Sequence, residues 1–355
     1  MKYLKKSLIP LLSLIYLVPT THVMAQCIKG DCDTGKGTYS YPNGDYYKGE
    51  WRSAKRHGTG IYKTALGDEY KGEWRNDEMH GQGQYSYRNE DVYEGSFKKG
   101  KISGEGTYYF NNGSIYKGEW EDDQHHGKGT LSYPNGTEIS GIWTNGVVNG
   151  RAKYFYANGN YYEGEFSNNQ RNGKGKMVFE RGDVYVGDWY MGKQEGFGKM
   201  TFASNVVYEG EWQDGKMTGE GDLITAAGSR YRGKFQNGRY NGKGMLTHSN
   251  SDTYNGEWLN GKKHGKGIYV YSDGSKYEGE WNMDTRHGTG MYIYADGTVY
   301  EGEFHSGKVH GLGKMTKPDG EVLEGRFLYG KFVSKESVDR GSARGMDHAE
   351  DSKEK

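Results

Sequence analysis

Six histidines occupy the same place in a repeated pattern of this chain. They are His57, His80, His126, His264, His287 and His310. A regular ladder of histidines could bind a metal ion or respond to pH. Equivalent residues one repeat apart should stand roughly 9–10 Å apart with parallel side chains, and parallel side chains do not converge on one zinc ion. The other copies carry Ser103, Asn149, Asn172, Glu195, Thr218 and Asn241 at this place. We therefore predict hydrogen-bonding turn residues here, and no metal site.

Carboxylates recur in the same way. They are Glu50, Glu73, Glu119, Glu165, Asp188, Glu211, Glu257, Glu280 and Glu303. Paired carboxylates could hydrolyse a glycosidic bond. Catalytic residues are usually unique in a chain, whereas these are repeated, so a solvated face with cross-strand Lys and Arg partners explains them better. The recurring Gly-x-Gly pairs lack the strand-to-helix context of phosphate loops, and the sequence has no nucleophile elbow or His-Glu-x-x-His motif. We expect no enzymatic activity and no cofactor.

The charge balance argues against nucleic acid as a partner. The 47 Lys and Arg residues equal the 47 Asp and Glu residues, so the formal net charge is zero. Proteins that bind nucleic acid usually carry a basic surplus, because neutralising phosphates supplies most of their affinity. With 33% hydrophobic and 26% charged residues the chain would resemble a disordered one. Its 32 Tyr, 11 Phe and 8 Trp contradict disorder, and its 59 Gly indicate turns and short strands.

One motif, Tyr-x-Gly-x-Trp/Phe, repeats every 23 residues in 13 copies without insertion or deletion. The copies begin at Tyr47, Tyr70, Tyr93, Tyr116, Ile139, Tyr162, Tyr185, Tyr208, Tyr231, Tyr254, Tyr277, Tyr300 and Leu323. The third position is always Gly, and all 8 Trp of the chain lie at the fifth position. Gly-x-Gly pairs interleave with this motif from Gly35/Gly37 to Gly311/Gly313, with Ala152 as the one departure, and Asn-Gly or Asp-Gly often precedes the next copy.

Each copy reads as one β-hairpin. In residues 47–51 the side chains of Tyr47, Gly49 and Trp51 face one side and the charged residues face the other, as in a half-buried strand. A loop should lead to a second strand beginning at Gly58, and Asn-Gly or Asp-Gly turns should lead to the next copy. We expect the glycines to make room for the Tyr and Trp rings of adjoining hairpins. Stacked copies would then bury a continuous aromatic stripe.

The repeat resembles the MORN (membrane occupation and recognition nexus) repeat. The Tyr-x-Gly-x-Trp core, the His57-Gly58-Thr59-Gly60 step and the Asn-Gly turn carry the resemblance, which covers residues 35–332. It implies an all-β fold, namely an elongated, twisted, single-layer antiparallel sheet of about 13 stacked hairpins with a grooved aromatic face. It also implies roles in scaffolding, dimerisation and sometimes lipid contact. We expect no lipid kinase or methyltransferase domain of the kind found in some members.

The two ends of the chain differ from the repeats. Lys2, Lys5 and Lys6, an apolar stretch over residues 8–18 and the sequence Val-Met-Ala at 23–25 predict a signal peptide over residues 1–25. The apolar stretch is too short for a spanning helix, which needs about 20 residues. We expect cleavage after Ala25 and a periplasmic or secreted protein. Residues 333–355 lack a hydrophobic period and are predicted to be a disordered charged tail.

Two cysteines lie in an N-terminal cap, residues 26–34. In an oxidising compartment Cys27 and Cys32 could form a small disulfide. A lipidated Cys27 is the alternative, but Gln26 fits the lipoprotein cleavage position poorly.

The predicted function is an exported, non-enzymatic scaffold that binds a protein partner or associates with itself through an aromatic groove. The groove candidates are Tyr47, Trp51, Tyr70, Trp74, Tyr116, Trp120, Tyr185, Trp189, Tyr208, Trp212, Tyr254, Trp258, Tyr277 and Trp281. The alternative is peripheral attachment to a membrane or envelope surface. The basic residues Lys48, Lys71, Lys117 and Arg232 would then meet anionic headgroups.

Overall fold

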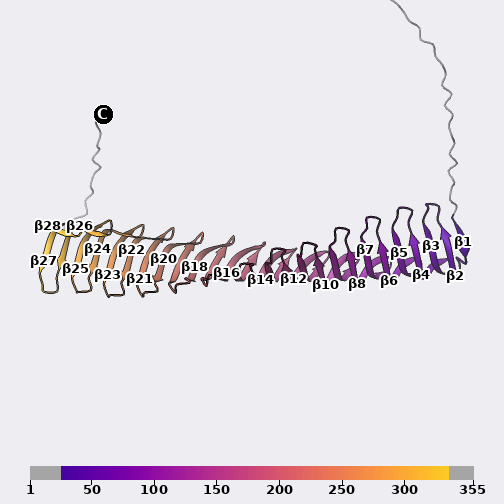
Figure 1. The fold of residues 1–355 in the computed structure, drawn as a ribbon, viewed down its shortest axis with the longest axis horizontal. Helices are drawn as coiled ribbons and strands as arrows, with labels where there is room; N and C mark the ends of the chain where they lie inside the picture. The colour runs from indigo at the N-terminus through magenta and orange to yellow at the C-terminus, as the bar shows by residue number, and fades with distance from the viewer. Residues whose placement is uncertain (1–24, 336–355) are drawn as a thin grey trace, which may run out of the picture. The chain divides into compact units, whose positions relative to one another are not determined.

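The protein is all-β in a computed structural model that describes residues 25–335. Its 28 strands form an open antiparallel sheet in which consecutive strands pair, as predicted (Figure 1). The described residues contain no helix, and so none that could cross a membrane. The predicted signal peptide up to residue 24 and the predicted tail beyond residue 335 lie outside the described residues.

The described residues divide into two compact units. The first holds residues 25–135 and 142–147. Its strands are β1 (Gln26–Gly30), β2 (Gly35–Ser40), β3 (Tyr46–Arg52), β4 (Lys55–Lys63), β5 (Glu69–Arg75), β6 (Glu78–Ser86), β7 (Val92–Lys98), β8 (Lys101–Tyr109), β9 (Ile115–Glu121) and β10 (Gln124–Ser132). Strand β11 (Glu138–Thr144) contributes residues to both units.

The second unit holds residues 136–141 and 148–335. Its strands are β12 (Val147–Phe155, from Val148), β13 (Tyr161–Ser167), β14 (Gln170–Val178), β15 (Val184–Tyr190), β16 (Lys193–Thr201), β17 (Val207–Gln213), β18 (Lys216–Ile224), β19 (Arg230–Gln236), β20 (Arg239–Thr247), β21 (Thr253–Leu259), β22 (Lys262–Val270), β23 (Lys276–Asn282), β24 (Thr285–Ile293), β25 (Val299–His305), β26 (Lys308–Thr316), β27 (Val322–Leu328) and β28 (Lys331–Lys335).

The turn inside each hairpin is shorter than the sequence suggested. Only Ser53 and Ala54 separate β3 from β4, and their φ angles are 51° and 54°. Two consecutive positive φ angles are typical of a type I′ turn, whose twist matches that of the flanking strands. The residues expected to form a loop are therefore strand residues. His57 lies in β4, opposite Glu50, so the prediction that this histidine position belongs to a turn is wrong.

Each tyrosine of the motif packs over the glycines of its own hairpin. Gly49 and Gly60 pair directly across β3 and β4, and a Cβ atom at either would overlap the Tyr47 side chain. The Tyr47 hydroxyl donates to the Glu50 carbonyl at 3.0 Å, and the side chain is fully buried. Room for a ring is therefore the reason for the glycines, as predicted, but the tyrosine ring comes from the same hairpin rather than the adjoining one.

The tryptophans link one hairpin to the next. The Trp51 indole N–H donates to the Gly37 carbonyl of the preceding hairpin at 3.3 Å. The Tyr47 ring lies edge-to-face between Trp51, at 5.0 Å, and Trp74 of the following hairpin, at 5.3 Å between centroids. The same alternation runs to Trp143 in the first unit and from Phe166 to Phe327 in the second. Each such ring pair contributes about 0.5–1.5 kcal/mol beyond its buried area.

The turns between hairpins are joined by carboxylates. One Asp45 carboxylate oxygen accepts from the Ala65 amide of the next turn at 2.8 Å, and the other accepts from the Tyr62 hydroxyl. Burial raises the pKa of Asp45, but the hydrogen bonds from Tyr62, Ala65 and Asn43 together lower it by more. The pKa of Asp45 therefore lies below its ordinary value. Asp91 accepts from the Asn111 amide in the same way, at 2.7 Å. Neighbouring turns are thus held in register.

Candidate binding groove

A row of glycines runs across the strands of the first unit. The cross-strand pairs connect Gly49, Gly60, Gly72, Gly83, Gly95, Gly106, Gly118 and Gly129 in turn. Tyrosine rings cover this row on one face, which we call the tyrosine face. On the opposite face, the charged face, the row presents bare backbone, because a side chain at these positions would point toward the tyrosine face. A depression therefore follows the row on the charged face.

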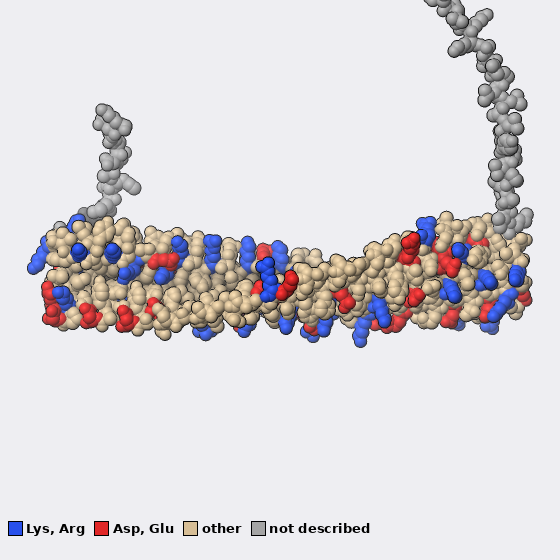
Figure 2. Space-filling view, in the orientation of Figure 1, with Lys and Arg blue, Asp and Glu red and all other residues tan. Residues whose placement is uncertain are grey.

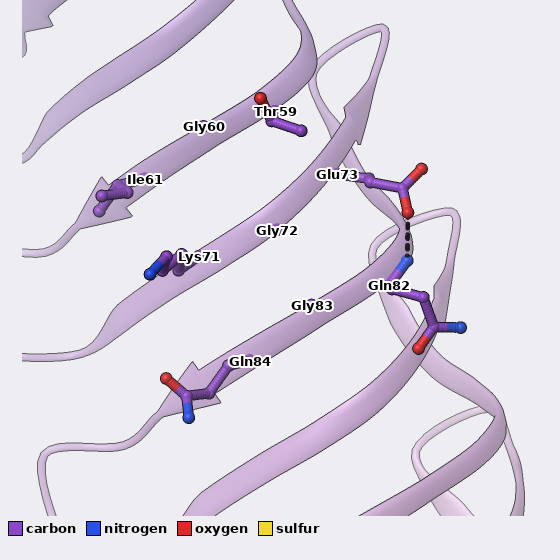
Figure 3. Close-up of a pocket in the computed structure, with 9 residues that line it drawn as sticks. All are labelled: Thr59, Gly60, Ile61, Lys71, Gly72, Glu73, Gln82, Gly83 and Gln84. Carbon is purple, nitrogen blue, oxygen red and sulfur yellow. Dashed lines mark hydrogen bonds between the residues drawn. The ribbon is translucent and has the colours of Figure 1, made fainter.

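Side chains from the flanking positions form the two rims of this depression. Thr59, Glu73 and Gln82 stand along one side of the glycine floor, and Ile61, Lys71 and Gln84 stand along the other (Figure 3). This pocket has a volume of about 570 Å³. A pocket of about 410 Å³ adjoins it at Thr59 and Ile61, and one of about 520 Å³ adjoins it at Gln82 and Gln84. We call this continuous depression, from Lys29 to Lys117, the glycine groove.

The two rims of the glycine groove differ in whether their charged side chains already have partners within the protein. On one rim, Glu73 accepts a hydrogen bond from the Gln82 amide at 2.9 Å (Figure 3), and the Gln82 side chain donates to Ser96 at 2.8 Å. On the other rim Lys48, Lys71 and Lys117 are exposed. None of these three lysines makes an ion pair with another residue among those the structure describes. Glu94 lies on the same rim between Lys71 and Lys117 and accepts a hydrogen bond from the Gln84 side chain at 2.6 Å. The three lysines can therefore bind anionic groups of a ligand.

The repeated carboxylates have a structural role that their spacing did not reveal. In β3 and β4, Gly49 pairs with Gly60 but Glu50 pairs with His57, so Gly58 and Thr59 form a β-bulge. Gly58 has a φ of 57°, and the Glu50 carboxylate lies where a Cβ atom would be. In later copies the carboxylate accepts from the amide after the bulged glycine, as in Lys128 to Glu119 and Glu220 to Glu211, both at 2.9 Å. The carboxylates therefore hold the bulges in place.

The fourteen predicted groove residues all lie in the buried aromatic column on the tyrosine face. Their exposed fractions range from 0% for Tyr47 to 8% for Trp51. Each of these rings is covered by protein in this structure. That they line a binding groove stays a prediction. The basic candidates differ as well, because Arg232 pairs with Asp222 at 3.0 Å whereas Lys48, Lys71 and Lys117 remain available.

Sequence reasoning missed the side chains that cover the column. They occupy the position just before the recurrent histidine. The Arg56 guanidinium lies 4.3 Å from the Trp74 ring, and the Arg171 guanidinium lies 4.4 Å from the Trp189 ring. Elsewhere this position carries His125, whose ring stacks on Tyr116 at 3.7 Å. The signal available in the sequence was a long or aromatic side chain at this place in most copies.

The recurrent histidines are not brought together around a common centre. Among residues 25–335, no three His, Cys, Asp or Glu side chains are grouped as a bound metal ion would require. Cys27 and Cys32 are joined in a disulfide with their Cα atoms 5.9 Å apart, in the hairpin that precedes the first full copy.

The chain belongs to the MORN repeat family. The MORN repeat pattern matches 13 consecutive segments, the first at residues 34–46 and the last at residues 300–322. A search of curated proteins finds no match.

Solved structures give only weak likenesses. The TCP domain of Drosophila melanogaster SAS-4, solved with a proline-rich motif of Ana2, is 15% identical over 59% of this chain and 99% of that chain, with a TM-score of 0.28. The TCP10 domain of Danio rerio CPAP, solved with a STIL peptide, is 11% identical over 83% of this chain and 100% of that chain, with a TM-score of 0.20. Scores this low carry no argument about function.

Proposed function

We propose that this chain is an exported, non-enzymatic scaffold that binds an extended, acidic polypeptide segment in the glycine groove. One observation carries the proposal. A continuous groove of bare glycine backbone is bordered by the ammonium groups of Lys48, Lys71 and Lys117, which have no partner among the described residues. The disulfide between Cys27 and Cys32 supports export, because such bonds persist in oxidising compartments.

The dimensions of the groove favour a single extended chain. Its rims are formed by residues two positions apart on each strand, and such residues are separated by about 7 Å. That width admits one extended polymer and excludes a helix of about 10 Å diameter. The amide side chains of Gln82 and Gln84 can exchange hydrogen bonds with peptide groups, and the lysines can pair with carboxylates. A polypeptide with acidic residues satisfies both requirements.

In this proposal the residues of the predicted aromatic groove support the glycine groove from the opposite face and do not contact the partner directly. Each tyrosine ring of the buried column packs closely against two paired glycines of the floor. Direct contact between a partner and rings such as Trp74 would require a covering side chain such as Arg56 to leave its place. The column therefore serves partner binding chiefly through the rigidity it gives to the groove.

An anionic membrane is the second candidate ligand, because the same lysines could meet lipid headgroups. The two ligands are distinguished with one set of variants. The triple variant Lys48→Gln, Lys71→Gln and Lys117→Gln removes the three rim lysines. A matched control, Lys98→Gln, Lys99→Gln and Lys216→Gln, removes three exposed lysines that lie outside the glycine groove.

The probes are a fluorescent glutamate-rich peptide and vesicles containing phosphatidylserine. We expect the unchanged protein and the control to bind the peptide, and the triple variant to bind it about tenfold more weakly, since each exposed charge pair contributes about 0.5 kcal/mol. If the unchanged protein binds vesicles but not the peptide, and the triple variant loses vesicle binding, the ligand is an anionic membrane and not a peptide. Equal peptide binding by all three proteins would refute the proposal.

A further inference from the structure

The carboxylates beside the β-bulges share one hydrogen-bonding arrangement. Glu73 accepts from the amide of Gln82, the residue that follows the bulged glycine, at 2.9 Å. Glu280 accepts from the amide of Thr289 at 3.2 Å and from its hydroxyl group at 2.9 Å. Such a bulge therefore provides a place for a carboxylate, formed by a backbone N–H and by the side chain of the same residue.

The copy that begins at Tyr231 keeps the bulge but lacks the carboxylate. The pairing of β19 with β20 shifts as in the other hairpins, and the bulged Gly242 has a φ of 69°. Lys234 occupies the position of the carboxylate, and its Cδ atom would lie 3.4 Å from a Cβ atom at Gly242. The amide that follows the bulged glycine belongs to Lys243. The hairpin itself therefore offers this amide no carboxylate.

Lys234 is particular to this copy and is not a feature of the repeat. In the other copies with a bulge this position carries an acid or one of the neutral residues Ser96 and Ile142. Arg326 of the last copy pairs with Ser334 in β28, a strand without glycine. Within residues 25–335, a cation at the carboxylate position beside a bulged glycine therefore occurs in this copy alone.

Two lysine side chains adjoin at this bulge. The hydrogen bond between the Thr289 and Glu280 side chains shows that these two positions are neighbours, and here they carry Lys243 and Lys234. Like charges side by side destabilise a sheet. Neither lysine makes an ion pair with another residue in the described part of the chain. An anion bound between the two ammonium groups would relieve their repulsion.

The nearby acidic residues are held in other contacts or lie too far away to neutralise these lysines. Asp222 accepts from Arg230 Nε at 2.8 Å and from Arg232 Nε at 3.0 Å. Glu257 lies over the bulged glycine of its own hairpin. Glu220 lies opposite Lys234 in the pairing of β18 with β19 but not within ion-pair distance of it. The four cations named around this bulge therefore outnumber the three acids.

We propose that this copy binds a carboxylate group of a ligand in the place that glutamate fills in other copies. One carboxylate oxygen accepts from the Lys243 amide, and the ammonium groups of Lys234 and Lys243 pair with the carboxylate. Arg232 stands two residues from Lys234 along β19, about 7 Å away. Its side chain is 63% exposed and provides a second point of attachment for a neighbouring oxygen of the ligand. We call Arg232, Lys234 and Lys243 the carboxylate site.

The class of ligand follows from what fills the equivalent places. In other copies the occupant is a planar carboxylate on a flexible side chain, such as Glu211. The ligand is therefore a flexible chain that carries a carboxylate, as an acidic residue or the C-terminus of a peptide does. A tetrahedral phosphate has no counterpart in the other copies. The carboxylate site lies in the second unit and does not rest on the glycine groove.

An NMR titration of protein labelled with 15N-lysine reports directly on the Lys243 amide, whose signal is identified by its absence from Lys243→Arg. N-acetylglutamate amide supplies only a side-chain carboxylate, and N-acetylglycine supplies only a terminal one. We expect at least one of them to shift the Lys243 signal with a Kd below about 50 mM, the range for a few exposed charge pairs. The probe that binds identifies the source of the carboxylate, and neutral N-acetylglutamine amide should cause no shift. No shift with either carboxylate, or a stronger response to inorganic phosphate, would overturn the proposal.

Lys234→Glu supplies the missing carboxylate from within the chain. We expect this variant to bind the probes at least about tenfold more weakly and to unfold at a higher temperature than the unchanged protein. The matched control Lys308→Glu makes the same charge change at an exposed position of the second unit outside the carboxylate site, and it should bind as the unchanged protein does. Binding that persists in Lys234→Glu, or that is lost equally in the control, would refute the site.

The same titration separates the carboxylate site from the glycine groove. In the triple variant Lys48→Gln, Lys71→Gln and Lys117→Gln the Lys243 signal should shift as in the unchanged protein, whether or not the glycine groove binds a peptide. A shift that disappears with the three rim lysines would assign the carboxylate to the glycine groove and overturn the separate site.

Discussion

Single residues in this protein are explained mainly by the contact between a tyrosine ring and two glycines. The chain provides a natural test of that contact. In the copy that begins at Ile139 the tyrosine is missing, and in the same copy Ala152 replaces the second glycine of the Gly-x-Gly pair. A side chain is thus tolerated at this place in a copy without the ring. Tyrosine and glycine therefore occur together for a steric reason and not as separate preferences.

Substitution at Gly60 follows from this contact. Gly60→Ala should lower the free energy of unfolding by about 1–3 kcal/mol, because its Cβ atom would overlap the Tyr47 ring. The double variant Gly60→Ala with Tyr47→Ile copies the natural combination of Ile139 and Ala152. The alanine should then cost much less than in the presence of the ring, as measured by urea denaturation of the single and double variants. An alanine with the same cost in both backgrounds would contradict the account.

His125 should make the first unit sensitive to acid. Burial against Tyr116, Trp120 and Trp143 lowers the pKa of His125 to about 4. The unfolded chain binds this proton near pH 6.5, so the folded state loses stability as the pH falls from about 6.5 toward 4. The loss should be about 1–2 kcal/mol after allowance for the exposed part of the ring.

The control for His125 comes from the second unit. Tyr240 occupies the equivalent position and stacks on Tyr231 at 3.7 Å. His125→Tyr should keep the stacking and remove the titration, so thermal denaturation at pH 7 and pH 4.5 should show a smaller acid-induced loss than in the unchanged protein. An equal loss in both proteins would mean that other groups cause it.

At the scale of the strand and turn, the positive φ angles of the hairpin turns restrict which residues fit there. Ala54 has a φ of 54°, whereas many equivalent positions carry glycine, such as Gly100 with a φ of 79°. Ala54→Gly should raise the free energy of unfolding by up to about 1 kcal/mol, because glycine adopts positive φ without steric cost. Gly100→Ala should lower it by about the same amount. Both changes are measured by thermal denaturation, and a destabilising Ala54→Gly or a stabilising Gly100→Ala would contradict the turn geometry.

The hairpins were predicted from the sequence, their two-residue turns were missed, and their bulges could not be predicted. The 23-residue period and the alternation in residues 47–51 define the first strand of each pair. Ser53 and Ala54 carry no Asn-Gly signal, but the equivalent residues Asn145-Gly146 and Asn237-Gly238 do. The turn was read as part of a longer loop because the signal in these copies was not used. The bulge at Gly58 and Thr59 depends on the pairing of β3 with β4, which a one-dimensional pattern does not contain. The role of Glu50 beside the bulge was missed for the same reason.

At the scale of the whole molecule, the chain is a stack in which each copy is stabilised by its neighbours. Charged residues of both signs lie interspersed on the face shown in Figure 2, as the zero net charge suggested. The sequence predicted the all-β array and its aromatic interior. It did not predict that the interior is fully covered, because the covering residue varies from Arg56 to His125 to Tyr240. A partner bound in the proposed glycine groove would contact the charged face and not the rings.

Local stability should follow the completeness of the aromatic column. The copy at Ile139 lacks a tyrosine, so amides of its hairpin should exchange with deuterium faster than those of β16 and β17, which flank complete ring pairs. Ile139→Tyr with Ala152→Gly should restore protection in hydrogen-exchange mass spectrometry. Uniform exchange along the array, unchanged by the repair, would show that the column does not set local stability.

The central claim is that the glycine groove on the charged face binds the partner. Lysine footprinting by acetylation, with and without a glutamate-rich peptide, tests it in one measurement. The account predicts that Lys48, Lys71 and Lys117 become protected while Lys98, Lys99 and Lys216 react as before. Protection of both sets alike, or of the second set alone, would contradict it.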